Sequence, residues 1–234
     1  MTESNFQSKT PKPDIIKTIT RVSPTLVKAA SQFQAAILAD VNGRRGTANS
    51  RIRPLATSMK VAGPAITVEV RAGDNLMIHA AIALAQPGDV IVVDAKGDQT
   101  CALIGEIMVT LSEKIGIAGF VLDGPVRDAD ALIEKGYPIF SVGTNPCGPT
   151  KKTPGRVNWP VSIGGVAVNP GDLVVADADG VTIVERDKVE GIIELAKQKV
   201  ADETARLDGI RAGKQLSPAW LPNALADAGV TTEA

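Results

Sequence analysis

Three short apolar runs, separated by helix-forming segments, constrain the fold of this chain more than any other feature. The runs are DVIVVDA at 89–95, IAGFVLD at 117–123 and YPIFSVG at 137–143. Each run is continuous rather than alternating, which is typical of a strand buried on both faces of a sheet. Helical segments at 105–116 and 127–136 lie between them. This strand–helix–strand–helix–strand order predicts a parallel α/β layer.

The segments on either side of this layer predict further elements. Before it, we expect one helix over 23–41, because Ser23 is a good N-cap and Pro24 suits the first helical position. A strand at 61–70 and a helix closed by Pro87-Gly88 follow.

The second half of the chain changes character. Apolar and polar residues alternate over 156–184 between turn sequences, which predicts an antiparallel β section. A long C-terminal helix is expected at about 186–212. We therefore expect a single α/β domain at 14–234, preceded by a flexible leader at 1–13.

The composition excludes several classes of protein. The chain has 234 residues, a net charge of -1 and 3% aromatic residues, which argues against a nucleic-acid partner. No apolar run has the ~20 residues needed to span a membrane, and the polar N-terminus lacks the apolar region of a signal peptide. Two cysteines form neither a disulfide framework nor a zinc motif. We expect a cytoplasmic protein.

Charged residues gather where the second apolar run ends. Asp123, Arg127, Asp128 and Asp130 follow it within a few positions. In open α/β sheets ligands bind beyond the carboxyl ends of the strands, so Arg127 and Asp128 are candidates for an anion contact and a divalent-cation ligand. The alternative is an Asp N-cap with an Arg that pairs locally.

A second candidate region is the helix that begins near Gly105 and Glu106. A glycine at a helix start lets a ligand approach the backbone, and the free N–H groups of Ile107 and Met108 could hold a carboxylate. Glu106 lies in an otherwise apolar stretch, where an acid needs a partner or a function. Both regions are expected to open onto one crevice.

Two more residues carry open alternatives. Glu203 lies on the apolar stripe of the C-terminal helix, either as a salt-bridged interface residue or as an active-site acid of a neighbouring subunit. His79, the only histidine, either lines the crevice or packs in the core. One histidine excludes a His-based metal site.

Four segments in this order resemble the RraA-like family. They are DNLMIHAAIALAQPGDVIVVDA at 74–95, IGEIM at 104–108, GFVLDGPVRDADAL at 119–132, and VNPGDLVVADADGVTIV at 168–184. The family includes class II pyruvate aldolases that act on 4-hydroxy-4-methyl-2-oxoglutarate and 4-carboxy-4-hydroxy-2-oxoadipate. The resemblance implies a swivelling β/β/α fold and covers nearly the whole chain.

The resemblance also implies a function and roles for residues. The activity would be a divalent-metal-dependent lyase that cleaves a carbon–carbon bond of a 2-oxo acid to give pyruvate through a metal-stabilised enolate. Asp128 would bind Mg²⁺ or Mn²⁺, and Arg127 would contact the keto oxygen of the substrate. The backbone from Gly105 to Met108 would bind the substrate carboxylate. Glu106 would orient metal-bound water, and Glu203 of an adjacent subunit would assist the proton relay. Similar proteins form trimers or hexamers with sites at subunit interfaces.

One residue differs from the aldolase pattern, so more than one function remains open. The aldolases carry Asp where this chain has Glu106, and Glu occurs there in relatives that include the bacterial regulator of ribonuclease E. Oxaloacetate has no hydroxyl group that must be deprotonated, so its decarboxylation does not require a base for that proton. Oxaloacetate decarboxylation is therefore expected in addition to aldol cleavage or instead of it.

The alternatives are a non-catalytic regulator that binds a ribonuclease or another protein, and a Schiff-base aldolase. Under the regulator alternative, the arginines of the Arg44–Arg53 loop are a candidate surface for an acidic partner; otherwise they form a solvated loop. No lysine lies in an apolar segment suited to a Schiff-base aldolase.

Overall fold

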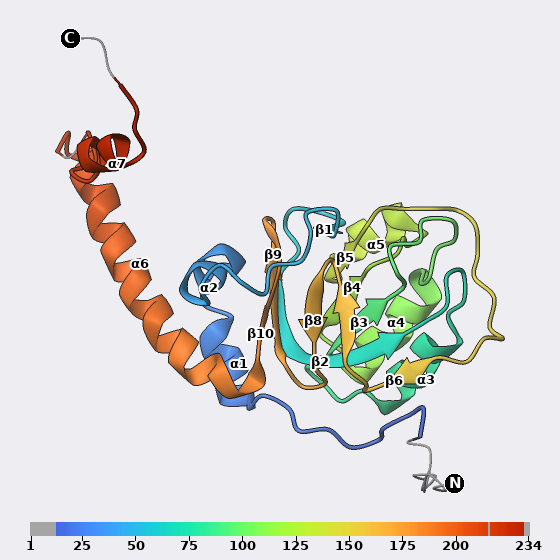
Figure 1. The fold of residues 1–234 in the computed structure, drawn as a ribbon. Helices are drawn as coiled ribbons and strands as arrows, with labels where there is room; N and C mark the ends of the chain where they lie inside the picture. Colours follow the sequence, from blue (N-terminus) through green and yellow to red (C-terminus); the bar gives the residue numbers. More distant parts are fainter. Residues whose placement is uncertain (1–12, 215, 232–234) are drawn as a thin grey trace, which may run out of the picture.

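The computed structural model describes residues 13–214 and 216–231, so nearly all of the expected leader lies outside the described residues. An eight-stranded sheet forms the centre of the molecule (Figure 1). Its four parallel strands are β2 (Val61–Glu69), β3 (Val90–Asp94), β4 (Gly119–Leu122) and β5 (Ile139–Ser141). The helices between them are α3 (Leu76–Leu84), α4 (Glu106–Ile115) and α5 (Ala129–Lys135). The predicted parallel layer is confirmed.

Antiparallel strands extend this layer at both edges. The two-residue strand β1 (Arg53–Pro54) pairs with β5, and β6 (Arg156–Val157) pairs with β2. The hairpin of β9 (Leu173–Asp177) and β10 (Gly180–Val184) continues the sheet beside β2, whereas β7 (Val161–Ile163) and β8 (Val166–Val168) form a separate hairpin. The predicted antiparallel section is therefore also present.

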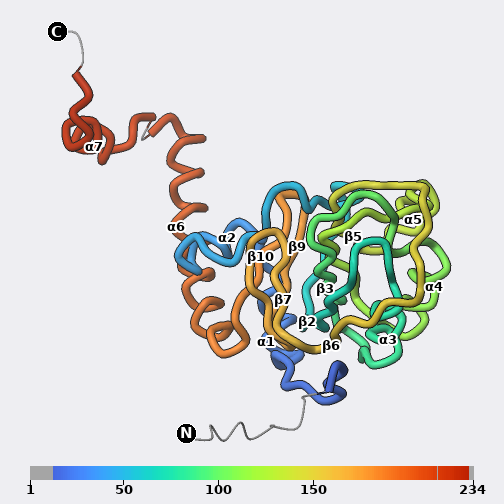
Figure 2. Tube along the Cα trace, turned by 45° about the vertical axis from the view of Figure 1, so that its right-hand side comes forward, coloured from blue at the N-terminus to red at the C-terminus, as the bar shows by residue number. Residues whose placement is uncertain are grey.

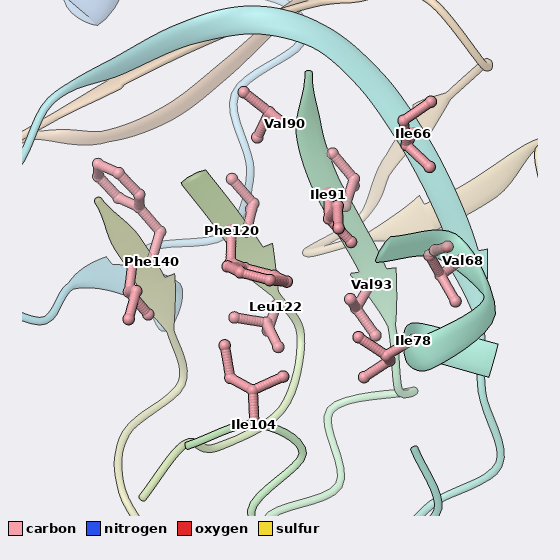
Figure 3. Close-up of a cluster of buried hydrophobic side chains, with 14 of the residues drawn as sticks. Ile66, Val68, Ile78, Val90, Ile91, Val93, Ile104, Phe120, Leu122 and Phe140 are labelled. Atoms are coloured by element: carbon pink, nitrogen blue, oxygen red, sulfur yellow. The ribbon is translucent and has the colours of Figure 1, made fainter. Parts of the chain in front are cut away.

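The core forms on the parallel strands. Every residue of β3 and β4 is buried, as the continuous apolar runs predict. Figure 3 shows Ile91 and Val93 of β3 near Ile78 of α3, and Ile104 close to Leu122 of β4. Ile104 lies two residues before α4, and its burial holds the chain that enters that helix against the core.

The single helix expected over 23–41 is wrong, because the segment forms α1 (Pro24–Ala30) and α2 (Ala35–Val41). Ser23 caps α1 and Pro24 is its first residue, as predicted. The hydroxyl of Ser31 then donates a 2.9 Å hydrogen bond to the carbonyl of Lys28 at the end of α1. The carboxylate of Asp177 accepts the N–H of Ala35 at 2.8 Å, which starts α2 anew through a tertiary contact.

The C-terminal helix projects from the body of the molecule. It consists of a 3₁₀ turn (Arg186–Lys188) and α6 (Val189–Arg211), followed by α7 (Leu221–Asp227), which the sequence did not predict. Val189, Ile192, Ile193 and Ala196 are buried, but the later part of α6 leads away from the sheet, on the opposite side from α4 and α5 (Figures 1 and 2). Within the described ranges, the structure has no helix long and apolar enough to cross a membrane.

Candidate active site

Three loops at the carboxyl ends of β3, β4 and β5 are joined by backbone bridges. Val126 pairs in parallel with Ile104 on one side and with Thr144 on the other. The N–H of Arg127 donates to the carbonyl of Ile104 at 3.1 Å, and the N–H of Val126 donates to the carbonyl of Gly143 at 3.0 Å. The loops thus extend the parallel order of the strands, and the residues after Val126 lie at the ligand-binding edge of an α/β sheet.

A pocket of about 140 Å³ lies at this edge. It is bounded by the start of α4, by the Arg127–Asp128 pair, by one face of α3 and by the loop after β5. The lining residues are Asn75, His79, Leu103, Ile104, Gly105, Ile107, Met108, Arg127, Asp128, Pro149 and Lys151. The structure therefore brings together six residues that the sequence singled out: His79, Gly105, Ile107, Met108, Arg127 and Asp128.

Asp128 occupies the N-cap position of α5 but does not cap that helix. Its backbone is left-handed, with φ 62° and ψ 39°, and its side chain makes no capping hydrogen bond to α5. Instead, Oδ2 accepts the N–H of Glu106 at 2.9 Å, at the start of α4. The Nε atom of Arg127 lies 3.8 Å from the same oxygen, and both side chains are more than 40% exposed. The simple N-cap alternative is wrong for this aspartate.

Gly105 makes room for this arrangement. A Cβ atom on Gly105 would lie 2.3 Å from Oδ2 of Asp128 and 3.1 Å from Cγ of Arg127. Because real Cβ atoms do not approach other atoms so closely, any larger residue would displace the pair. The φ of Gly105 is −152°, so it is space rather than backbone conformation that requires glycine here.

The first turn of α4 presents unused hydrogen-bond donors. Within the described residues, the N–H groups of Ile107 and Met108 donate no hydrogen bond, and the first bond into this helix runs from Val109 to Gly105. The positive end of the helix dipole reinforces these donors, which makes the turn a ready site for an anion.

The wall contributed by α3 holds polar atoms that lack partners. Asn75 is 2% exposed, and its amide nitrogen donates to the carbonyl of Leu103 at 2.8 Å. Its Oδ1 atom and the Nε2 atom of His79 are buried without a hydrogen bond. Burial and, to a smaller extent, nearby Lys151 lower the pKa of His79 below its ordinary value. Buried polar atoms without partners are unusual and point to a ligand or water at this wall.

Sequence reasoning missed Asn75 and Lys151. Asn75 lies four residues before His79, so a helical reading would have placed both on one face. Lys151 belongs to an irregular loop, and no local pattern signals its position.

Asp74 positions that loop against α3. Its Oδ2 atom accepts hydrogen bonds from the Thr150 hydroxyl at 2.6 Å and from the N–H groups of Lys152 and Thr153 at 2.7 and 3.0 Å. Burial opposes ionisation of Asp74, but these bonds and one from the Leu76 N–H outweigh it and hold its pKa well below the ordinary range. The charged carboxylate therefore fixes both ends of the Lys151 segment.

The two other predicted acids lie outside the pocket wall of this chain. Glu106 is exposed at the first position of α4, so its neighbours in the apolar stretch do not bury its carboxylate. Glu203 forms a 2.9 Å ion pair with Lys199, which also pairs with Asp40. It lies on α6, across the molecule from α4 (Figures 1 and 2).

One arginine of the Arg44–Arg53 loop is paired within the chain. Arg51 forms a bidentate pair with Asp123, at 3.0 and 2.7 Å, and the Asp123 carboxylate also accepts the N–H of Gly164. Asp123 therefore ties the end of β4 to neighbouring loops. Arg51 is unavailable for the acidic-partner surface that the sequence suggested.

Asp128 is the only carboxylate in the pocket wall, and the described part of the chain contains no group of three or more His, Cys, Asp or Glu able to hold a metal. Its Oδ1 atom makes no hydrogen bond there. One carboxylate oxygen in an open pocket suits a hard cation such as Mg²⁺, which keeps several waters and binds substrate oxygens. The residues fit such an ion and do not fit a closed site made only of protein ligands.

A family model described as "RraA-like: Aldolase/RraA" matches residues 23–183. The chain belongs to the RraA-like family. A relative from Halalkalibacterium halodurans, named "Putative 4-hydroxy-4-methyl-2-oxoglutarate aldolase", is 47% identical over 157 residues, which make up 67% of this chain and 75% of the relative. The family resemblance inferred from the sequence is confirmed, and the name of this relative supports an aldolase-type function.

Two solved structures share the fold. Streptomyces coelicolor RraAS2, described as an unusual member of the RNase ES inhibitor RraA protein family, has a TM-score of 0.74 and 32% identity, and the match covers 81% of this chain and 99% of that one. An uncharacterized protein from Pseudomonas syringae has a TM-score of 0.75 and 26% identity, with coverages of 84% and 96%. The α/β fold expected for the RraA-like family is therefore confirmed.

Proposed function

We propose that this RraA-like protein is a divalent-metal-dependent lyase that releases pyruvate from a 2-oxo acid. The substrate class is 4-hydroxy-4-methyl-2-oxoglutarate and related acids, oxaloacetate, or both. One observation carries the proposal: Arg127, Asp128 and the unused N–H groups at the start of α4 line the same pocket. Lys151 adds a second positive charge to this wall, which suits a substrate with two carboxylates.

The groups that line the pocket have different roles in the proposed reaction. The N–H groups of Ile107 and Met108 bind the carboxylate next to the keto group. The guanidinium of Arg127 donates to the keto oxygen and stabilises the negative charge that develops there as the C3–C4 bond breaks. A Mg²⁺ or Mn²⁺ ion held by Asp128 would supply Lewis-acid polarisation of the same oxygen.

Aldol cleavage requires the transfer of a hydroxyl proton that decarboxylation does not require. The 4-hydroxyl of an aldol substrate must lose its proton as the bond breaks, and Glu106 is the carboxylate that we assign to this transfer. Oxaloacetate loses CO₂ from C4 and has no such proton to give up. Changes at Glu106 should therefore affect the two reactions differently.

The test is pyruvate release from oxaloacetate and from 4-hydroxy-4-methyl-2-oxoglutarate, measured with Mg²⁺ and again with EDTA. The proposal expects release from at least one substrate, lost in EDTA and restored by excess Mg²⁺. Release that is unchanged by EDTA, or no release from either acid, would contradict it.

We further propose that the site is completed by Glu203 of a second copy in a trimer or hexamer. The side chains of Val200, Leu207 and Ile210 lie on the same helical face as Glu203 and are 39%, 49% and 41% exposed in the single chain. An apolar stripe of this kind on a projecting helix favours burial against another chain. Light scattering should give a trimer or hexamer mass, and Leu207→Glu should lower it. A monomeric wild type would contradict this assembly.

A regulator of a ribonuclease is the second candidate. The similarity to Streptomyces RraAS2 and the glutamate at position 106 favour it. The two functions separate cleanly in experiment: a regulator should bind and inhibit a purified RNase E-type enzyme without EDTA-sensitive pyruvate release.

A further inference from the structure

The two cysteines of the chain lie side by side although 46 positions separate them. Cys101 lies in the loop between β3 and α4, and Cys147 lies in the loop after β5. Their Sγ atoms are 3.1 Å apart. Cys147 is exposed and Cys101 is partly exposed, so small reagents in solution can reach the pair.

The backbones of the two loops are already held together. The N–H of Ala102 donates to the carbonyl of Cys147 at 2.8 Å, and the side-chain amide of Asn145 donates to the carbonyl of Gln99 at 2.8 Å. The N–H of Cys147 is in turn fixed by Oδ1 of Asn145 at 2.8 Å. A disulfide has an S–S distance of about 2.0 Å, so the sulfurs need to approach by only about 1 Å, within a frame that is otherwise set.

We propose that Cys101 and Cys147 are a modification site that forms a reversible intrachain disulfide with a disulfide oxidant such as oxidised glutathione. In the first step, the thiolate of one cysteine attacks a glutathione sulfur, forms a mixed disulfide and releases one glutathione thiolate. The other cysteine then attacks the protein sulfur of the mixed disulfide and releases the second. The two protein thiol protons end on two reduced glutathione molecules, and the S–S bond of the oxidant is replaced by the S–S bond of the protein.

Other uses of the pair have less support. The described residues around it supply no further histidine, cysteine or acidic ligand for a metal cluster. The hydrogen bond with Cys101 raises the pKa of the Cys147 thiol, so this sulfur is less ionised at neutral pH than an isolated thiol. In the absence of an oxidant, the two cysteines are therefore reduced thiols.

The bond would tie together two walls of the pocket. Gly148 follows Cys147 directly, and a Cβ atom on it would lie 2.9 Å from Nη1 of Arg127. Pro149 and Lys151 of the same loop line the pocket, and Gly105 ends the loop that carries Cys101. Oxidation should therefore restrain the loop at 143–151 against the start of α4.

The experiment treats the full-length protein with oxidised glutathione and analyses it by mass spectrometry and non-reducing electrophoresis. We expect the chain to lose about 2 Da, the mass of two hydrogens, and to remain a single chain. Trypsin should release peptides 97–114 and 136–151 as one linked species that dithiothreitol separates. Cys101→Ser and Cys147→Ser should each carry at most one glutathione and never the linked pair.

Hydrogen exchange supplies a readout that does not depend on activity. Amides within 143–151 should exchange more slowly in the oxidised wild type than in the reduced protein, and the two serine variants should not change. Two separate glutathione adducts on the wild-type chain, or a bond between chains, would overturn the proposal. Unchanged exchange in the linked protein would overturn the restraint on the pocket.

Discussion

Oδ2 of Asp128 accepts a 2.9 Å hydrogen bond from the backbone N–H of Glu106. This bond joins the start of α5 to the start of α4, and it uses one of the N–H donors in the first turn of α4. It leaves the next two N–H groups, those of Ile107 and Met108, beside the Asp128 carboxylate. The proposed cation ligand and the proposed carboxylate site are thereby set at a fixed separation.

Gly105→Ala should disable this site without unfolding the protein. The new methyl group would push against Asp128 and Arg127, and a displacement of about 1 Å costs roughly 100-fold in rate. Gly191→Ala is the control, because a Cβ there meets nothing within 4 Å and alanine favours the helix. Equal pyruvate release by the two variants, with equal circular dichroism spectra, would contradict the role of Gly105.

Asp128→Asn should weaken metal binding and keep the fold. Asparagine tolerates the left-handed backbone and retains an oxygen for the Glu106 N–H, so the melting temperature should change by less than about 3 °C. Calorimetry should show Mg²⁺ affinity lowered at least about tenfold. Asp130→Asn, an exposed change on the same helix, should bind Mg²⁺ as the wild type does. A wild-type affinity in Asp128→Asn would remove Asp128 as the ligand.

His79 should make the protein less stable in acid. Burial first, and Lys151 second, lower its pKa below the ordinary value of 6.5, so the unfolded chain binds more protons than the folded chain between the two values. The stability is therefore complete above pH 6.5 and falls as the pH drops toward the pKa of the folded state. Urea unfolding at about pH 7.5 and about pH 5 should show a smaller loss for His79→Gln. An equal loss in both proteins would mean that another group is responsible.

The sequence predicted the strands and loops that support the site better than the side chains that line the pocket. Continuous apolar runs indicate buried parallel strands, and parallel strands place the residues that follow them at one edge, which is why Arg127, Asp128 and Gly105 could be grouped in advance. The break between α1 and α2 depends on Asp177, which is 142 positions from Ala35, and no local pattern contains it. Lys151 is likewise positioned by Asp74 through long-range hydrogen bonds.

Glu106→Gln should separate the two proposed reactions. Glutamine keeps the length of the side chain and the backbone N–H that bonds Asp128, but it cannot take a proton. Cleavage of 4-hydroxy-4-methyl-2-oxoglutarate should fall by about 100-fold, whereas decarboxylation of oxaloacetate should change by less than about fivefold. Rate assays on both substrates with one enzyme preparation measure this difference. An equal loss of both would show that Glu106 does not act on the hydroxyl proton.

The most direct test of the central claim is pyruvate release by Arg127→Ala beside Arg45→Ala, each with Mg²⁺ and with EDTA. Arg45 is an exposed arginine that forms no ion pair with the described residues and does not belong to α6, so its variant controls for loss of a surface charge. The account predicts EDTA-sensitive release by Arg45→Ala at the wild-type rate, and a loss of roughly 100- to 1,000-fold in Arg127→Ala. Release by Arg127→Ala at the control rate would contradict the assignment of this pocket as the site of bond cleavage.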